Sequence, residues 1–349
     1  MDPVQASCVV EGRAFVGEEL LLRDVAITVE AGRILSIDET TPRDGPWICP
    51  AFFNAHTHLA DTVALDVPAS GDLASLVAPP AGLKHRLLAA AAPAAIREAM
   101  RSSIRSMIAS GTTGFADFRE GGADGVSLLT EAVEGQPCRA VIFGRDGGER
   151  IADGVGVPSY RPDPGLEAAV ADARRQGKFV AFHAGEKDAD DIEGALSFGP
   201  DLLVHCTHAT DTQLKRIADE GVPVAVCPRS NWSLGVAMSR SHPPIKRMLD
   251  LGCRVLLGTD NVMFVQPDMF QEMAFTACIY RIPPADILRM ATAGSSLFTA
   301  PHYISEGNPA AFFTVDPLRA NFRYSHDPLA TVVKRMNQGL IGRIIYSMR

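Results

Sequence analysis

Short runs in which apolar and polar residues alternate mark the two ends of the chain. Near the start, residues 8–16, 20–30 and 33–39 alternate in this way, and Glu30-Ala31-Gly32 separates the last two runs as a turn. Such runs predict β-strands with one buried face. The segment AAFFTVDP, which begins at residue 310, returns to the same pattern. We therefore expect a small β domain that residues 1–49 begin and residues 305–349 rejoin.

Between these ends, short apolar runs alternate with longer segments of helical period. Apolar residues recur on one side of residues 94–110, and helices are also expected over 211–220 and 284–297. Eight strand–helix units over about 250 residues are typical of a parallel (β/α)8 barrel of the TIM type. We expect an α/β fold in which residues 50–304 form this barrel. The expected strands are Ile48–Thr57, Gly114–Phe118, Ala140–Phe143, Gly154–Pro158, Phe179–His183, Leu202–His205, Pro223–Cys227 and Arg254–Gly258.

Composition narrows the class of protein. The 349 residues are 46% hydrophobic and 21% charged, which excludes a mostly disordered chain. The formal net charge of −8 leaves no basic surplus for binding nucleic acid or an anionic membrane. The start lacks the pattern of a signal peptide, and the longest apolar stretch, Leu87 to Ile96, is too short to span a bilayer. Seven cysteines without a CxxC pair indicate reduced thiols. We expect a cytoplasmic protein, and its oligomeric state stays open, a homo-oligomer included.

Residues able to bind metals or move protons gather at the carboxyl ends of the expected strands. His56 and His58 end the first strand, His183 ends the fifth, His205 ends the sixth, and Asp260 follows the eighth. In a barrel all these ends open on one face, which is where barrel enzymes carry out catalysis. Residues far apart in the sequence are therefore expected to meet at one site.

The spacing of these residues fits a metal site. Residues i and i+2 of a strand share a face, so His56 and His58 can point inward together while Thr57 points away. Their imidazoles, the imidazole of His183 and the carboxylate of Asp260 form a set of nitrogen and oxygen ligands that suits Zn²⁺ or Fe²⁺. Because no thiolate takes part, we expect an open position for water rather than a structural zinc site. One divalent ion per chain is expected, with zinc favoured over iron.

Four stretches resemble the motifs of one enzyme family. They are PAFFNAHTHLADT, HAGE, LLVHCTHATDTQLKRIADEGVPVAVCPRSN and VLLGTDNVMFVQPDMFQEM, in this order within residues 20–300. They are similar to the amidohydrolase superfamily, in particular its cytosine deaminase/chlorohydrolase-like branch. The resemblance implies the four metal ligands named above and a proton-shuttling Glu186, which matches HxxE. It also implies that His205 orients the attacking water and that Asp260 takes up the proton of this water.

The resemblance further implies hydrolytic deamination. HxxE favours an enzyme in which metal-activated water attacks an amino-substituted nitrogen heterocycle (a purine, pyrimidine, pterin or nucleoside) and ammonia leaves. Binuclear relatives carry a carboxylated lysine in strand four, and residues 154–158 contain no lysine. The same site could instead release another group, as in an s-triazine chlorohydrolase or a cyclic amidohydrolase. A non-catalytic scaffold is the remaining alternative, and the complete ligand set disfavours it.

The resemblance predicts the substrate-binding residues less directly than the metal ligands. CPRSN matches the stretch that follows strand seven in the family, so Arg229, Ser230 and Asn231 are candidate substrate-binding residues. After strand eight the chain reads GTDNVMF, where many relatives read GTDG followed by a loop rich in Ser and Asn. His208 is expected to support the site rather than act in it. The roles of Arg119, Glu120, Arg145 and His85 stay open, and His242, His302 and His326 lack motif support.

Overall fold

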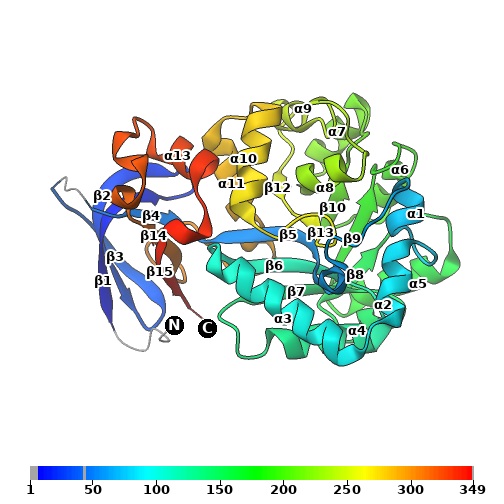
Figure 1. Cartoon of the computed structure of the whole chain (residues 1–349). Coiled ribbons are helices and arrows are strands. Elements are labelled where there is room, and N and C mark those ends of the chain that lie inside the picture. Colours follow the sequence, from blue (N-terminus) through cyan, green and yellow to red (C-terminus); the bar gives the residue numbers. More distant parts are fainter. Residues whose placement is uncertain (1–6, 42–44, 348–349) are drawn as a thin grey trace.

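The computed structural model describes residues 7–41 and 45–347, and these residues form two β-sheets. Figure 1 shows the smaller sheet on the left, where the first and last segments of the chain meet, and the larger sheet on the right, surrounded by helices. The expected α/β architecture, a TIM-like barrel joined to a small β element, is confirmed.

Both ends of the chain contribute to the smaller sheet. Its strands are β1 (Cys8–Val16), β2 (Leu21–Glu30), β3 (Arg33–Glu39), β4 (Trp47–Pro50), β14 (Ala311–Val315) and β15 (Ile341–Tyr346), in the order β15-β14-β4-β1-β2-β3. β1 and β2 pair antiparallel from Cys8 opposite Val29 to Val16 opposite Leu21. Alternate residues of β2, such as Val25 and Ile27, pack into the core of this sheet. The division into domains at residues 49 and 304 stays a prediction.

The larger sheet is the barrel. Its strands are β5 (Phe52–His58), β6 (Thr112–Arg119), β7 (Arg139–Gly144), β8 (Gly154–Val157), β9 (Phe179–Ala184), β10 (Leu202–His205), β11 (Val224–Val226), β12 (Val255–Leu257) and β13 (Asp260–Asn261). From β5 to β12, each strand pairs in parallel with the next strand along the chain. β13 continues β12 after a short interruption and pairs with β5, with Asp260 opposite Thr57. The eighth strand therefore returns the sheet to its first strand, and apolar side chains from strands all round the sheet fill the interior.

The expected first strand, Ile48–Thr57, is two strands in two different sheets. β4 ends at Pro50 and β5 begins at Phe52. Ala51 donates its backbone N–H to Ala311 in the small sheet, whereas Phe52 donates to Gly111 just before β6. The continuous apolar run predicts burial at every position, and it does not reveal that the chain passes from one core to another.

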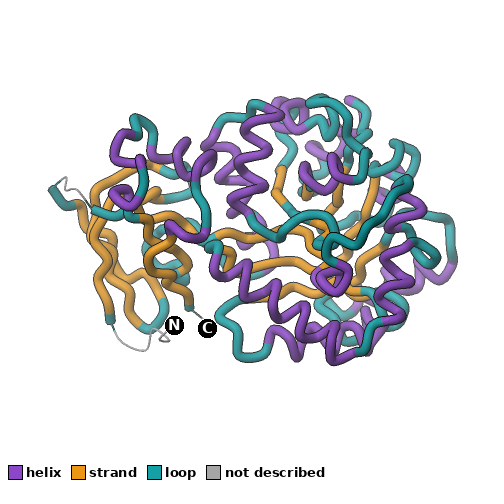
Figure 2. Tube along the Cα trace, in the orientation of Figure 1, coloured by secondary structure: helices purple, strands orange, loops and turns teal. Residues whose placement is uncertain are grey.

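Helices cover the outside of the barrel, as Figure 2 shows. α3 (Pro93–Ala109) and α7 (Asp211–Asp219) lie where the helical period predicts them, whereas the helix expected over 284–297 is divided at Ala293 into α11 (Pro284–Thr292) and α12 (Gly294–Phe298). α10 (Met269–Tyr280) was not predicted, because apolar residues on most of its sides hide the one-sided stripe. The other helices are α1 (Leu73–Val77), α2 (Leu83–Ala90), α4 (Gly122–Val133), α5 (Pro164–Arg175), α6 (Ile192–Leu196), α8 (Pro228–Ser233), α9 (Ile245–Asp250) and α13 (Pro328–Arg335), with 3-10 turns η1 (Leu59–Ala64), η2 (Gly148–Arg150), η3 (Pro317–Arg319), η4 (Asn321–Tyr324) and η5 (Gln338–Leu340).

The connection between β5 and α3 leaves the barrel at the carboxyl ends of the strands. It contains η1, α1 and α2, and α2 packs against η1. This segment, residues 59–92, therefore lies at the face where the predicted site residues meet.

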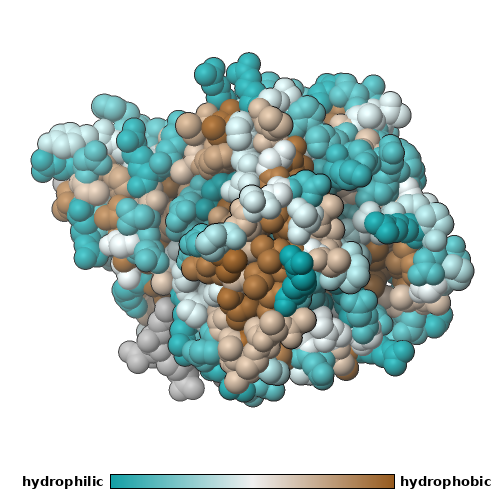
Figure 3. All heavy atoms as spheres, turned by 45° about the vertical axis from the view of Figure 1, so that its right-hand side comes forward, coloured by the Kyte–Doolittle hydropathy of each residue, from teal (hydrophilic) through white to brown (hydrophobic). Residues whose placement is uncertain are grey.

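The molecular surface is mostly polar in the view of Figure 3, with an apolar patch near the middle of that face and smaller apolar areas elsewhere. Among the described residues, no helix has both the length and the apolar character needed to cross a membrane.

Candidate active site

An irregularity in β5 directs the two histidines of HTH into the barrel. Ala55 packs in the interior core, so strict alternation would send Thr57 inward and both histidines outward. The pairing of β5 with β6 shifts by one residue just before Thr57. Such a bulge changes the facing of the side chains that follow it. His56 and His58 therefore face the interior, while Thr57 turns away and donates its hydroxyl to Asp117.

Two other predicted residues adopt a left-handed backbone conformation. The angle φ is 76° at His205 and 60° at Asp260. Such conformations cost of order 1–3 kcal/mol in non-glycine residues and are concentrated at functional sites. Val204 packs in the interior, so an extended strand would turn His205 outward. The left-handed turn brings its ring back, to 5.6 Å from the ring of His56 and 5.5 Å from that of His183 between centroids.

Imidazole nitrogens and carboxylate oxygens meet in a small volume at this end of the barrel. Nε2 of His56 lies 3.1 Å from Oδ1 of Asp260, and Nε2 of His58 lies 3.5 Å from the same oxygen. Three overlapping groups each have their ligand atoms within 4.8 Å of one another: His56, His183 and His205; His56, His58 and Asp260; and Glu186, His205 and Asp260. The structure thus brings together all the residues that the sequence predicts for metal binding and proton transfer.

Burial sets the charge state of these groups. It lowers the pKa of His56 and of His183, and it lowers the pKa of His58 to about 3, so the three imidazoles are neutral near pH 7. Burial alone would raise the pKa of Asp260, but the hydrogen bond from His56 leads the interactions that hold it well below its usual range. A carboxylate among neutral imidazoles is the form in which both bind a metal.

The hydrogen bonds made by Nδ1 distinguish His183 from His205. Nδ1 of His183 donates to the carbonyl of Val157 at 3.0 Å, which leaves a lone pair on Nε2. Nδ1 of His205 lies 3.3 Å from Nδ2 of Asn231, whose Oδ1 accepts from Thr207. In this arrangement Nδ1 of His205 accepts and its Nε2 carries the proton. The geometry suits His183 to ligating a metal and His205 to donating a hydrogen bond.

The three residues expected to bind substrate make other contacts. Ser230 donates to Oδ2 of Asp260 at 2.6 Å, and Asn231 supports the histidine ring as just described. Arg229 is tied to the buried carboxylate of Glu272 at 2.7 Å and to backbone carbonyls ahead of α10. These contacts position the site and its loops, and direct contact with a substrate stays a prediction.

Glu186 stands at the rim of the site, in the loop that follows β9. Its Oε1 lies 3.6 Å from Nε2 of His205, and its side chain keeps 21% of its surface exposed. Burial of the carboxyl group raises the pKa of Glu186. A carboxyl group whose pKa is shifted toward neutral pH can both take up and release a proton during a reaction.

The inner residues fit one divalent metal ion. Two ligands about 2.1 Å from a tetrahedral ion are about 3.4 Å apart. The distances from Oδ1 of Asp260 to the nitrogens of His56 and His58 are 3.1 and 3.5 Å. A set of nitrogen and oxygen donors without thiolate suits zinc or iron. β8 reads GVGV and offers no lysine to bridge a second ion.

A cluster of buried charges beside the histidines was not predicted from the sequence. Lys84 of α2 is 3% exposed, and its Nζ lies 3.0 Å from Oδ2 of Asp61 and 2.9 Å from Oε1 of Glu120. Arg119 pairs with Asp117 and with Glu120. The sequence around Lys84 gives no sign of burial, because only the fold brings α2 over the end of β6.

Comparison with known proteins identifies the family. The model of the amidohydrolase family matches residues 47–161 and 156–342. The chain belongs to the amidohydrolase family. The resemblance inferred from the motifs is thus confirmed at the level of the family.

Two relatives and one solved structure illustrate the range of similarity to known proteins. A putative aminohydrolase of Methanothermobacter thermautotrophicus is 37% identical, and the match covers 93% of each chain. A 5-methylthioadenosine/S-adenosylhomocysteine deaminase of Halobacterium salinarum is 28% identical and is matched over 78% of this chain and 74% of its own length. The crystal structure of guanine deaminase from C. acetobutylicum with bound guanine shares the fold, with a TM-score of 0.80, 16% identity and coverage of 98% and 99% of the two chains.

The remaining histidines of this amidohydrolase serve other parts of the fold. The ring of His85 bonds to the carbonyl of Val77 at 3.1 Å, that of His302 bonds to the carbonyl of Ala51 at 3.1 Å, and His208 packs against His242 with ring centroids 5.2 Å apart. Arg145 lies 3.3 Å from Glu120, at the edge of the buried charges.

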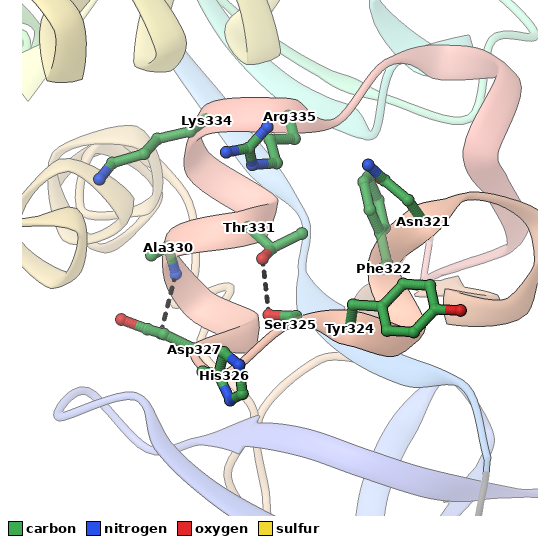
Figure 4. A pocket seen from close by; sticks show the side chains of 10 residues that line it. All are labelled: Asn321, Phe322, Tyr324, Ser325, His326, Asp327, Ala330, Thr331, Lys334 and Arg335. Atoms are coloured by element: carbon green, nitrogen blue, oxygen red, sulfur yellow. Dashed lines mark hydrogen bonds between the residues drawn. The ribbon is translucent and has the colours of Figure 1, made fainter.

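A separate surface hollow of about 350 Å³ lies between η4 and α13 and is shown in Figure 4. His326 is one of the residues that line this hollow. Two of its other polar residues already have partners: Ser325 is hydrogen-bonded to Thr331 at 2.6 Å, and Asp327 caps α13 by accepting from the backbone N–H of Ala330 at 3.0 Å. These polar groups stabilise the local turns, and none of them belongs to the groups of potential metal ligands.

Gly258 leaves the space that His56 needs. A Cβ atom at this glycine would lie 2.7 Å from Cβ and 2.8 Å from the backbone nitrogen of His56. We expect Gly258→Ala to displace His56, to destabilise the fold by about 1–3 kcal/mol and to weaken metal binding. Thermal unfolding and a competition assay against a chromophoric chelator measure both effects. Gly45→Ala is the control, since the nearest atom there is 3.7 Å away; equal behaviour of the two variants would contradict the steric argument.

Proposed function

We propose that this member of the amidohydrolase family is a zinc-dependent aminohydrolase that removes an amino group from a nitrogen heterocycle as ammonia. The observation that carries the proposal is the close approach of Glu186, His205 and Asp260, whose ligand atoms lie within 4.8 Å of one another beside the proposed metal ligands. Hydrolytic release of ammonia needs one group that takes a proton from water and another that delivers a proton to nitrogen. These side chains supply both.

His56, His58, His183 and Asp260 would hold the ion. When bound, a divalent ion supplies Lewis acidity, which lowers the pKa of water to about 7. Asp260 accepts the proton of the attacking water, and the hydrogen bond from Ser230 fixes the orientation of its carboxylate. His205 donates a hydrogen bond from its Nε2–H to the attacking oxygen and stabilises the negative charge that develops on it. A protonated Glu186 delivers its proton to the ring nitrogen, then takes up the hydroxyl proton of the tetrahedral adduct as the carbonyl forms and passes it to the departing ammonia. The proton that Asp260 took from water then restores the acid form of Glu186.

The names of relatives support the substrate class. One relative is named for deaminating 5-methylthioadenosine and S-adenosylhomocysteine, and one structural neighbour for deaminating guanine. We infer that the substrate is an aminopurine, an aminopyrimidine or a pterin, free or as a nucleoside. One zinc ion per chain and a cytoplasmic location belong to the same proposal.

The test is an ammonia-release screen with zinc-loaded protein over aminopurines, their nucleosides, aminopyrimidines and pterins. We expect ammonia from at least one of these heterocycles, loss of the activity after chelation, and recovery with added zinc. The same protein is also given a chlorinated s-triazine and a cyclic amide. Release of chloride or ring opening without any ammonia would overturn the deaminase proposal in favour of the chlorohydrolase or the cyclic amidohydrolase.

His205 and His208 provide a matched pair of variants. We expect His205→Asn to lower turnover by about 10²–10³-fold, the usual effect of removing one donor to a developing negative charge, with the metal retained. The fold should persist, because asparagine tolerates the left-handed conformation found at His205. His208→Asn changes a partly buried ring that packs on His242, so it should change turnover far less. Steady-state kinetics and elemental analysis measure the two effects, and the reverse ranking would contradict the assignment.

A further inference from the structure

The charged groups beside His58 form a connected cluster with no exposed member at its centre. The carboxylate of Glu120 pairs through Oε2 with Arg119, and its Oε1 lies 2.9 Å from Nζ of Lys84 and 3.3 Å from the guanidinium of Arg145. Glu120 is 8% exposed and Lys84 is 3% exposed. Buried charges are costly unless each has a partner, and each charge of this cluster has at least one.

Glu120 is the member of this cluster that reaches a proposed metal ligand. Its Oε1 lies 3.0 Å from Nδ1 of His58, on the side of the ring away from Nε2, which faces Asp260. Nδ1 of His58 makes no hydrogen bond to any other described residue, and Oε1 of Glu120 lies within reach of it. Buried polar atoms rarely stay unpaired, so Glu120 is the natural acceptor for this ring nitrogen, in addition to its pairing with Lys84.

Charge balance alone does not require Glu120 at this position. Lys84 already has the carboxylate of Asp61 at 3.0 Å, and Arg119 already has that of Asp117 at 3.2 Å. Each of the two most buried cations therefore has one carboxylate without Glu120. Apart from pairing with Arg145 at the edge of the cluster, what Glu120 adds is its contact with the ring of His58.

We propose that Glu120 is a positioning residue of the metal centre, which accepts the Nδ1 proton of His58 and so directs the Nε2 lone pair toward the ion. The inference rests on the metal centre of the proposed function. Metal-binding histidines usually donate their second ring N–H to a carboxylate or a carbonyl, and this fixes both the tautomer and the orientation of the ring. The carbonyl of Val157 does this for His183, and Glu120 does it for His58. Lys84 and Arg119 hold Glu120 in place, which connects α2 to the metal centre.

The test compares metal affinity and unfolding temperature in two variants of Glu120. Glu120→Gln removes the charge at nearly constant shape. Glu120→Asp keeps the charge beside Lys84 and Arg119 but withdraws it from His58. We expect zinc affinity, measured by competition with a chromophoric chelator, to fall about 10–100-fold in both variants. We also expect the visible spectrum of the cobalt-loaded protein to change in both.

Asp24→Asn is the control, because Asp24 is a partly buried carboxylate paired with Arg13 at 3.3 Å in the small sheet and contacts none of the proposed ligands. This variant should lose some thermal stability, while its zinc affinity and cobalt spectrum stay close to those of the parent. Wild-type zinc affinity in Glu120→Asp, or an equal loss in Asp24→Asn, would overturn the proposal. If Glu120→Gln does not fold, Glu120→Asp still decides the question.

Zinc affinity and the cobalt spectrum are measured without substrate. The role of Glu120 and the deaminase proposal can therefore be tested separately. A protein that binds zinc through the Glu120-dependent arrangement but releases no ammonia would overturn the deaminase proposal and leave this inference standing. If the protein releases ammonia but both Glu120 variants keep the zinc affinity of the parent, the deaminase proposal stands and the role of Glu120 is overturned. A protein that binds no divalent metal would overturn both.

Discussion

His183→Ala is expected to remove both the metal and the activity. The ring of His183 is held by the Val157 carbonyl so that Nε2 points toward the other ligands, and alanine offers no donor in its place. A metal ion contributes several kcal/mol to such reactions, so turnover should fall by roughly 10³-fold or more. Elemental analysis after gel filtration and the ammonia assay measure the two effects.

His302→Ala is the control for this prediction. The ring of His302 is also buried and also bonds to a backbone carbonyl, at Ala51, but it lies outside the groups of potential ligands. We expect this variant to lose stability while keeping its metal. Full metal occupancy in His183→Ala would remove His183 from the ligand set.

Glu186→Gln is expected to lower kcat by about 10²–10⁴-fold, the range that general acid–base catalysis contributes. Glutamine keeps the size of the side chain at the rim of the site but cannot carry the proton. Because Glu186 lies 3.6 Å from His205 and is not one of the proposed ligands, the metal should stay bound. Substrate affinity should change much less than kcat. Steady-state kinetics on the best heterocycle of the screen, together with metal analysis, test this prediction.

Asp188→Asn provides the comparison, since Asp188 is an exposed acid in the same loop. It should leave kcat near the parent value. Nearly parental turnover in Glu186→Gln would mean that another group delivers the proton, and the deaminase proposal would weaken with it.

The strands of the barrel could be predicted because each is a short buried run between turn signals. β10 agrees with the expected Leu202–His205 at both ends, and the other barrel strands lie within or close to the expected ranges. The errors have a common cause: where a segment is buried on most sides, the sequence no longer shows which way it faces. The split between β4 and β5 and the unpredicted α10 are both of this kind.

The buried charges illustrate a second limit. Lys84 and Asp61 come from the connection between β5 and α3, and Glu120 follows β6. Nothing in their local sequence distinguishes them from exposed residues. Their burial arises only when α2 packs against η1 at the end of the barrel, where each charge finds an opposite one.

The sequence by itself determined which residues meet at the site. In a parallel barrel all strands end on one face, so His56, His58, His183, His205 and Asp260 converge whatever the details of packing. The tertiary structure decided where their side chains point. The interior position of Ala55 would turn both histidines of HTH outward, and only the bulge in β5 reverses this. His205 is turned toward the other histidines by a left-handed backbone, which also occurs at Asp260 and which strand alternation does not predict. Both irregularities are locally unfavourable, so only the contacts of the assembled barrel can hold them in place.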